Sequence, residues 1–137
     1  MNIVTKEELK KRKQLLIVPV GISMQPLFKD SVTPVVVEYL NKKPQKDDIV
    51  LYIKESNQLV IHRVVSLKKD GAITRGDGCV GKGELIPYSN IFGKCTAFYK
   101  GENLVRVTDF KYKISVFIWK ILYPFRCLIK ILKKAGF

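Results

Sequence analysis

The stretch that decides the fold runs from residue 49 to residue 67 and reads IVLYIKESNQLVIHRVVSL. Two β-rich segments, Ile49–Lys54 and Leu59–Leu67, lie on either side of the turn residues Glu55-Ser56-Asn57. Valine, isoleucine and tyrosine dominate both segments, as a half-buried pleated surface prefers. The polar residues between them supply turn chemistry. This stretch therefore predicts two strands of a β domain.

The same pattern of short β-rich segments and turn residues continues on both sides of this stretch. Further turns are indicated by Asp70-Gly71 and by Gly101-Glu102-Asn103. Many short strands at close spacing, with no helical period between them, predict an antiparallel, mainly β domain over residues 15–108. The remaining expected strands are Leu15–Val20, Pro34–Leu40, Ala72–Arg75, Phe92–Tyr99 and Leu104–Thr108.

The segments outside this domain have a different character. Before it, Thr5 and Glu8 form a capping-box pattern that predicts a short basic helix through roughly Gln14, within an N-terminal segment 1–14. After it, a tail over residues 109–137 is strongly apolar and carries no acidic residue from 110 onward. Its basic residues are Lys111, Lys113, Lys120, Arg126, Lys130, Lys133 and Lys134.

The tail has the pattern of amphipathic helices. Lys113 and Lys120 are seven residues apart and so share one helical face, and Pro124 should kink or break the helix. Two short basic helices lying in a membrane interface are therefore expected. A spanning helix over Ile114–Leu132 is the alternative, which would place Lys120 and Arg126 in the hydrocarbon at roughly 2.5–3.5 kcal/mol each. A helix packed on the protein's own core explains the apolar face but not the cations.

Composition narrows the classes of function. The chain has 137 residues, 47% of them hydrophobic, which suits one ordered domain. Its net charge of +13 predicts an anionic partner, and the bulky apolar face of the tail favours an anionic membrane surface over nucleic acid. Three cysteines without C-x-x-C spacing and a single histidine indicate free, structural thiols and no metal site.

Three stretches carry residues that can do chemistry: GISMQP at 21–26, VIHRVV at 60–65 and TRGDG at 74–78. Ser23 follows a strand on a Gly/Pro turn, which suits a nucleophile with free backbone N–H groups nearby, those of Ser23 and Met24, to hold an oxyanion. His62 can take a hydroxyl proton near neutral pH. Asp77, between two glycines that permit close backbone approach, could orient that imidazole. Taken singly, each has an ordinary reading: a turn serine, a core histidine and a turn aspartate.

Together with KKPQKDDIVLY at 42–52 and IPYSNIFGKC at 86–95, these stretches resemble the type I signal peptidase clan, most closely its histidine-base branch. The resemblance covers about residues 19–96. It implies that Ser23 is the nucleophile, that His62 stands where many bacterial relatives carry a lysine base, and that Asp77 is the orienting acid. Glu84 is a candidate for a second acid.

The resemblance also implies a fold and a substrate. The fold is an antiparallel β barrel or sandwich, and no cofactor or metal is needed. The substrate is a precursor or leader peptide bound as an added β-strand at a membrane. The resemblance favours the extracytoplasmic face, whereas the cationic tail and free thiols would also suit the cytoplasmic side. Relatives usually carry an N-terminal transmembrane anchor, which is not evident here. The residues expected to line the substrate groove are Val20, Gly21, Ile22, Val60 and Ile61.

The sequence therefore predicts a serine endopeptidase of the signal-peptidase type, acting at a membrane. The alternative is a catalytically inactive, membrane-associated peptide-binding module of the same fold. A self-cleaving repressor-type protease of the same clan is disfavoured, because those relatives use lysine where His62 stands. The sequence does not indicate an oligomeric state.

Overall fold

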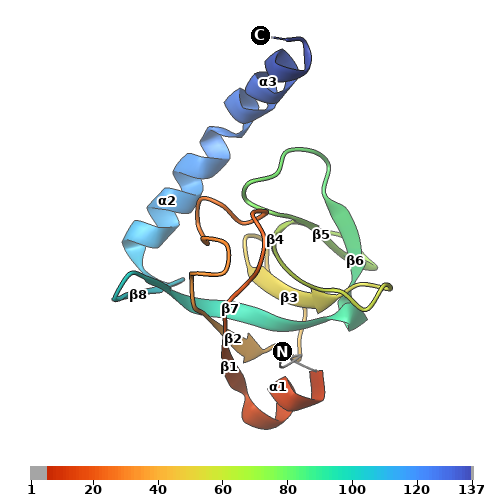
Figure 1. Ribbon diagram of the computed structural model, residues 1–137. Helices are drawn as coiled ribbons and strands as arrows, with labels where there is room; N and C mark the ends of the chain where they lie inside the picture. The colour runs from red at the N-terminus through yellow and green to blue at the C-terminus, as the bar shows by residue number, and fades with distance from the viewer. Residues whose placement is uncertain (1–5, 137) are drawn as a thin grey trace.

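A computed structural model describes residues 6–136 of the chain (Figure 1). It is mainly β: an eight-stranded antiparallel sheet with three α-helices, which confirms the predicted class. The elements in chain order are α1 (Lys6–Arg12), β1 (Gln14–Ile17), β2 (Val35–Tyr39), β3 (Ile49–Ile53), β4 (Leu59–Leu67), β5 (Gly71–Arg75), β6 (Glu84–Pro87), a 3₁₀ turn (Tyr88–Asn90), β7 (Ile91–Lys100), β8 (Asn103–Arg106), α2 (Phe110–Ile121) and α3 (Tyr123–Lys134).

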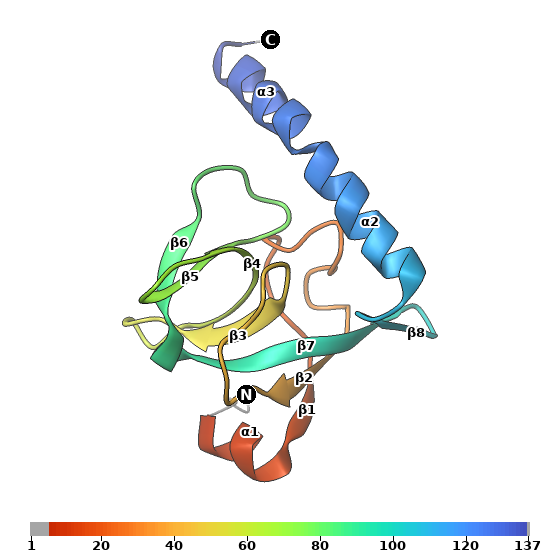
Figure 2. The same ribbon diagram turned by 180° about the vertical axis from the view of Figure 1, so that it is seen from behind.

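The strands follow the order β1-β2-β7-β3-β4-β5-β6, and β8 pairs with β7 (Figure 2). The sheet is strongly curved but not closed, since β1 and β6 are not paired with each other. Register shifts in the β2–β7, β3–β7 and β4–β5 pairs accompany the curvature, as bulges bend and twist a sheet. The barrel closure expected from the resemblance is thus not part of the observed fold.

Every expected strand has a counterpart, with small differences at the ends. The first strand ends at Ile17 rather than at Val20, and the chain from residue 18 to residue 34 is irregular, with turns and bends beginning at residue 21. The additional strand β6 was not predicted. The two tail helices meet at Leu122, with Pro124 in the first turn of α3, as the position of that proline predicts. Thr5 of the predicted capping box lies outside the described residues.

The curved sheet buries side chains on both of its faces. Because side chains alternate along a strand, β3 sends Ile49 and Leu51 into one hydrophobic cluster and Val50 and Tyr52 into another. Four of its five residues are buried, as a central strand requires. This alternation decides which side chains of the neighbouring strand β4 meet each other.

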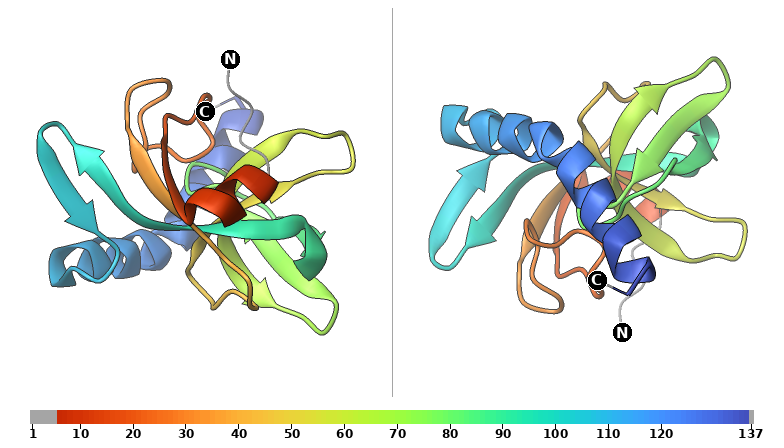
Figure 3. Two further views of the ribbon diagram at one scale, coloured as in Figure 1. Left: turned by 90° about the horizontal axis from the view of Figure 1, so that it is seen from below. Right: turned by 90° about the horizontal axis from the view of Figure 1, so that it is seen from above.

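The helices extend the first cluster. Leu9 of α1 is fully buried, and Tyr112 of α2 is buried with Val116 beside it. Helix α3 projects past the β domain, at the opposite end of the molecule from α1 (Figures 1 and 3). Among residues 6–136, no helix combines the length and the apolar character needed to cross a membrane.

Candidate active site

Ser23 lies in a turn that is anchored on both sides. Met24 and Phe28 are buried in the first cluster, and the Phe28 N–H donates to the Met24 carbonyl at 3.0 Å. On the other side, the Gly21 N–H donates to Asp30 Oδ1 at 2.7 Å. Gly21 has φ +110°, a conformation that L side chains rarely adopt. The serine is therefore held by packing and hydrogen bonds rather than by a strand.

The segment after β5 lies directly against this turn. The Gly78 N–H donates to the Ser23 carbonyl at 2.9 Å. A Cβ atom at Gly76 would lie 2.2 Å from that same carbonyl oxygen, and one at Gly78 would lie 2.8 Å from the Gln25 carbonyl oxygen. Only glycine fits at these two positions, which confirms the close backbone approach predicted from the TRGDG stretch.

His62 on β4 meets Ser23 as predicted. Its Nε2 lies 3.0 Å from Ser23 Oγ, across 39 residues of sequence. Partial burial lowers the pKa of His62 below its ordinary value of 6.5, and the charge of Lys54 lowers it further. Glu84 and Asp77 act in the opposite direction with smaller effects. The imidazole is therefore neutral at pH 7, the state required of a general base.

Asp77 does not contact the His62 ring, contrary to the predicted triad. Both carboxylate oxygens accept from the Arg63 guanidinium, at 2.7 Å and 2.8 Å, and both side chains are buried. His62 and Arg63 are consecutive in a strand and so point to opposite faces of the sheet. Asp77 lies on the Arg63 face, where Tyr112 also accepts from the guanidinium at 3.2 Å. Its role in the site is structural support.

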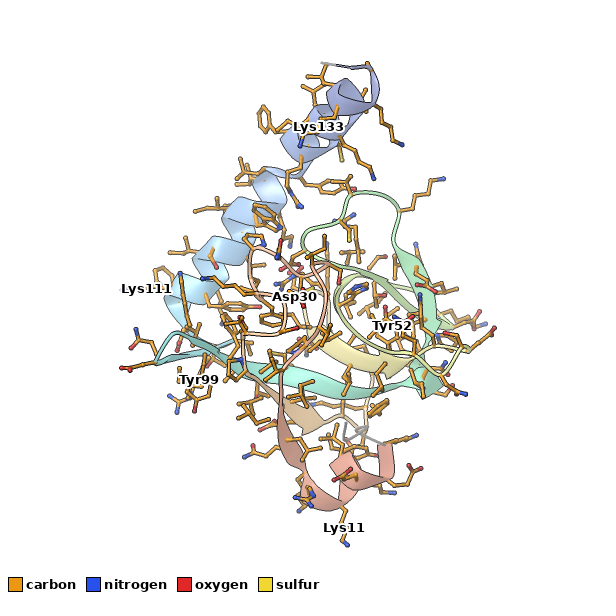
Figure 4. The ribbon with its side chains drawn as sticks, in the orientation of Figure 1. Lys11, Asp30, Tyr52, Tyr99, Lys111 and Lys133 are labelled. Carbon is orange, nitrogen blue, oxygen red and sulfur yellow. The ribbon has the colours of Figure 1, made fainter. Side chains whose placement is uncertain are left out.

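The other ring nitrogen of His62 contacts Tyr52, which is not among the site residues predicted from the sequence. His62 Nδ1 lies 3.2 Å from Tyr52 Oη, and that hydroxyl is 3.0 Å from Thr74 Oγ1. Tyr52 is fully buried among strands β3 to β6 (Figure 4), and burial raises its pKa, which keeps the phenol protonated. The strand register could have identified this residue from the sequence. Tyr52 pairs with Val60, and Val60 lies two residues before His62 on the same face of the strand.

The backbone N–H groups predicted for the oxyanion are available. Within residues 6–136, neither the Ser23 N–H nor the Met24 N–H donates to any protein atom. Of the predicted groove residues, Val20 and Ile22 are 78% and 68% exposed. Ile61 differs, because its side chain belongs to the buried core. A peptide could thus meet the side chains of the segment leading into Ser23, but only the backbone at Ile61.

The remaining groove and acid candidates have other contacts. Val60 is half-buried beside the second cluster, and the Gly21 N–H is already bonded to Asp30. The Glu84 carboxylate forms an ion pair with Lys54 at 3.0 Å and is half exposed. Glu84 therefore acts on His62 through its charge and not as a direct partner.

The tail helices contact the segment that follows β5. Trp119 Nε1–H donates to the Asp77 carbonyl at 2.8 Å, and the Arg126 guanidinium donates to the same oxygen at 2.7 Å. Tyr123 hydrogen-bonds the backbone of Gly81. The side of the helices that faces the β domain thus makes polar contacts beside its apolar ones, and two of the tail's cations take part: Arg126, and Lys120, which pairs with Asp47 at 3.0 Å.

A cavity whose lining includes neither Ser23 nor His62 lies beside helix α2. It measures about 1200 Å³ and opens between α2 and the strands β7 and β8, with Leu27, Phe98 and Val116 on its walls. The three cysteines are free, and burial raises the pKa of Cys95 to about 12, so its thiol stays protonated.

No protein-family model, curated protein or solved structure matches this chain. The site itself is a serine hydroxyl beside a neutral imidazole, next to two unbonded backbone N–H groups. Such an arrangement can form and hydrolyse an acyl-serine. The class that the geometry defines is therefore a candidate serine-histidine acyl-transfer site.

Proposed function

We propose that the protein is a serine endopeptidase of the signal-peptidase type, with Ser23 as nucleophile and His62 as general base. The contact of 3.0 Å between Ser23 Oγ and His62 Nε2 carries this proposal. Two segments far apart in sequence place these atoms at hydrogen-bonding distance, in a turn that packing and glycines hold in position. A serine that was only a turn residue would not need a neutral imidazole on its hydroxyl.

The reaction proceeds by acyl transfer. His62 Nε2 takes the hydroxyl proton while Ser23 Oγ attacks the scissile carbonyl carbon, and the Ser23 and Met24 N–H groups stabilise the oxyanion. The C–N bond breaks as the imidazolium returns the proton to the leaving amine. Water then attacks the acyl-serine with His62 as base, which releases the carboxylic acid and restores the serine hydroxyl.

The substrate would be the extended part of a precursor or leader peptide. The chain leading into Ser23 exposes a row of alternate apolar side chains, Leu16, Val18, Val20 and Ile22. Leu16 lies in the extended strand β1, where alternate residues share one side, and Gly21, with φ +110°, turns the chain before Ile22. A peptide strand added along this segment would receive main-chain hydrogen bonds and apolar contacts, and would bring its scissile bond to Ser23.

The proposed location is an anionic membrane surface. The tail exposes large apolar side chains on both helices, Phe117, Ile121, Phe125 and Ile131 among them. Two of its seven cations, Lys120 and Arg126, contact the β domain as described, and the other five make neither of these contacts. Lys111 lies at the start of α2 and Lys133 on α3 (Figure 4). An apolar face with cations and no acid suits an interface of anionic lipid.

A serine-directed acylating probe tests the proposal directly. We expect the protein to be labelled at one site, and Ser23→Ala and His62→Ala each to abolish labelling and peptide hydrolysis. Ser56→Ala, at an exposed turn serine, is the matched control and should behave as the native protein. Circular dichroism should show all three variants folded.

Two outcomes would decide against the enzyme. Hydrolysis that persists in purified Ser23→Ala would remove the nucleophile assignment. An unlabelled native protein that binds apolar peptides along residues 18–22 would indicate the alternative, an inactive peptide-binding module. Peptide affinity should then be lowered by Val20→Ser and unchanged by Ser23→Ala.

A further inference from the structure

The hydroxyl groups behind His62 form a chain that extends away from the serine. His62 Nδ1, Tyr52 Oη, Thr74 Oγ1 and the Glu84 carbonyl oxygen follow one another at 3.2, 3.0 and 3.5 Å. Tyr52 is 0% and Thr74 1% exposed, so water does not compete with these contacts. Each hydroxyl can donate one hydrogen and accept another, and the carbonyl can only accept.

The direction of this chain decides which nitrogen of His62 carries the proton. If Nδ1–H donates to Tyr52, then Tyr52 donates to Thr74 and Thr74 to the Glu84 carbonyl, and Nε2 is left to accept from Ser23. All four hydrogens are then used. In the opposite direction, Thr74 donates to Tyr52, Tyr52 donates to Nδ1, and Nε2–H donates to Ser23. The hydrogen of the serine hydroxyl then has no acceptor among the described residues. The first direction satisfies one more donor within the protein and is the one that catalysis needs.

We propose that Tyr52 and Thr74 are positioning residues that fix His62 in the Nδ1–H tautomer, the role assigned to an aspartate in a Ser-His-Asp triad. This inference rests on the proposed function, because a tautomer matters only if His62 acts as a base. The neutral phenol orients the ring without bringing a negative charge to it. Asp77 is thereby released to pair with Arg63 on the other face of the strand.

The single histidine of the chain allows the tautomer to be read without any substrate. Long-range ¹H–¹⁵N NMR above pH 7.5 should give one imidazole, with a protonated Nδ1 and an unprotonated Nε2. Tyr52→Phe should shift the population toward Nε2–H, because the buried Nδ1 then has no acceptor. Hydrolysis should fall by about 100-fold or more, within the range that a positioned general base contributes.

A second variant and a control keep the test decisive. Thr74→Val has the same shape but removes the acceptor of the Tyr52 hydrogen, so it should shift the tautomer in the same direction even if Tyr52→Phe does not fold. Tyr88→Phe removes a phenol that donates to the Lys68 carbonyl and should leave the His62 spectrum unchanged. A native protein in the Nε2–H form, or variants with the native tautomer, would overturn the inference. Absence of hydrolysis with the expected spectra would overturn the proposed function instead.

Discussion

At the scale of single residues, the basicity of His62 is set by its surroundings. Burial lowers its pKa most, and the ammonium group of Lys54 is the next cause. Lys54→Gln removes that cation and frees the Glu84 carboxylate from its ion pair, and both effects favour the imidazolium. We expect the pKa of His62 to rise in this variant. An NMR titration of the one histidine would measure it.

The same change should appear in the pH dependence of hydrolysis. The acidic limb of kcat/KM reports the pKa of the free base, so it should lie below 6.5 in the native protein and move to higher pH in Lys54→Gln. The free energy of unfolding should depend on pH in the same direction. Because the folded state lowers the pKa of His62, the contribution of the neutral imidazole to stability is complete above pH 6.5 and declines as the pH falls below it. Lys69→Gln removes an equal charge at an exposed turn. It should change neither the acidic limb of kcat/KM nor the titration of His62. An unmoved limb in Lys54→Gln would contradict the role of His62 as base.

Asp77 should matter to the stability of the fold more than to the protonation of His62. Asp77→Asn leaves the Arg63 guanidinium buried opposite a neutral amide, and breaking a buried pair in this way costs about 3–5 kcal/mol of unfolding free energy. Asp47→Asn, at the half-exposed pair with Lys120, should cost at most about 1 kcal/mol. Urea denaturation would compare them. Similar losses in the two variants would show that the Arg63–Asp77 pair is not the structural link described above.

The residues of the dyad could be predicted from sequence, but the partner of the histidine could not be taken from the motif alone. Ser23 and His62 stand out by residue type and local pattern. Asp77 stands out equally, yet the period of two along β4 places Arg63, not His62, on its face. Counting back across the turn at 55–57 pairs Tyr52 with Val60 and places Tyr52 beside His62. The strand register therefore predicts the partner of the histidine.

At the scale of elements, strand prediction succeeded where several residues are buried. Strand β4, with nine residues of which three are buried, was predicted at its observed ends. Strand β6 was missed because it has four residues and buries only Ile86, so it carries no alternating pattern. The open edges of the sheet could not be predicted, because closure depends on the curvature that three register shifts produce.

Helix α1 is short and highly charged, yet we expect it to be required for stability. Leu9 is its only buried side chain and has no exposed surface. Leu9→Ala should lower the free energy of unfolding by about 2–5 kcal/mol, since a cavity opens in the first cluster. Leu16→Ala, at a residue 59% exposed in the neighbouring strand β1, is the matched control and should change it by less than about 1 kcal/mol. Equal effects in thermal or urea melts would mean that α1 does not pack on the core in solution.

At the scale of the whole molecule, the tail joins the candidate site to the proposed membrane surface. The side of α2 that holds Tyr112 and Trp119 faces the β domain, and Trp119 bonds the backbone of Asp77, one residue from Gly76 and Gly78 at the Ser23 turn. Helix α3, whose apolar side chains Phe125 and Ile131 are exposed, extends beyond the β domain (Figure 1). One side of the tail thus packs on the β domain, while the exposed apolar side, which includes Phe125 and Ile131, is the one that we propose to meet lipid.

The distribution of charge gives the proposed membrane contact a sharp test. Reversing Lys130, Lys133 and Lys134 to Glu removes the three lysines of α3 and leaves Arg126 and the packed side of α2 unchanged. Reversing Lys10, Lys11 and Lys13 lowers the net charge equally at the opposite end of the molecule (Figure 1). Each lysine near an anionic surface contributes about 1 kcal/mol of binding free energy. The affinity of the α3 variant for vesicles should therefore fall by about 100-fold or more. Native protein and the α1 variant should co-sediment with phosphatidylglycerol-containing vesicles at low salt.

The apolar contribution separates insertion from simple charge attraction. Phe125→Ser removes a ring that is 62% exposed on α3, and it should weaken binding at high salt, where charge attraction is screened. Val32→Ser, at a residue 65% exposed in the turns before β2, should not. If the two triple variants lost binding equally, the net charge of the chain rather than the tail would be responsible. Binding that vanished at high salt in the native protein would place the helices on the headgroups and not among the acyl chains, and the exposed apolar face would then need a protein partner.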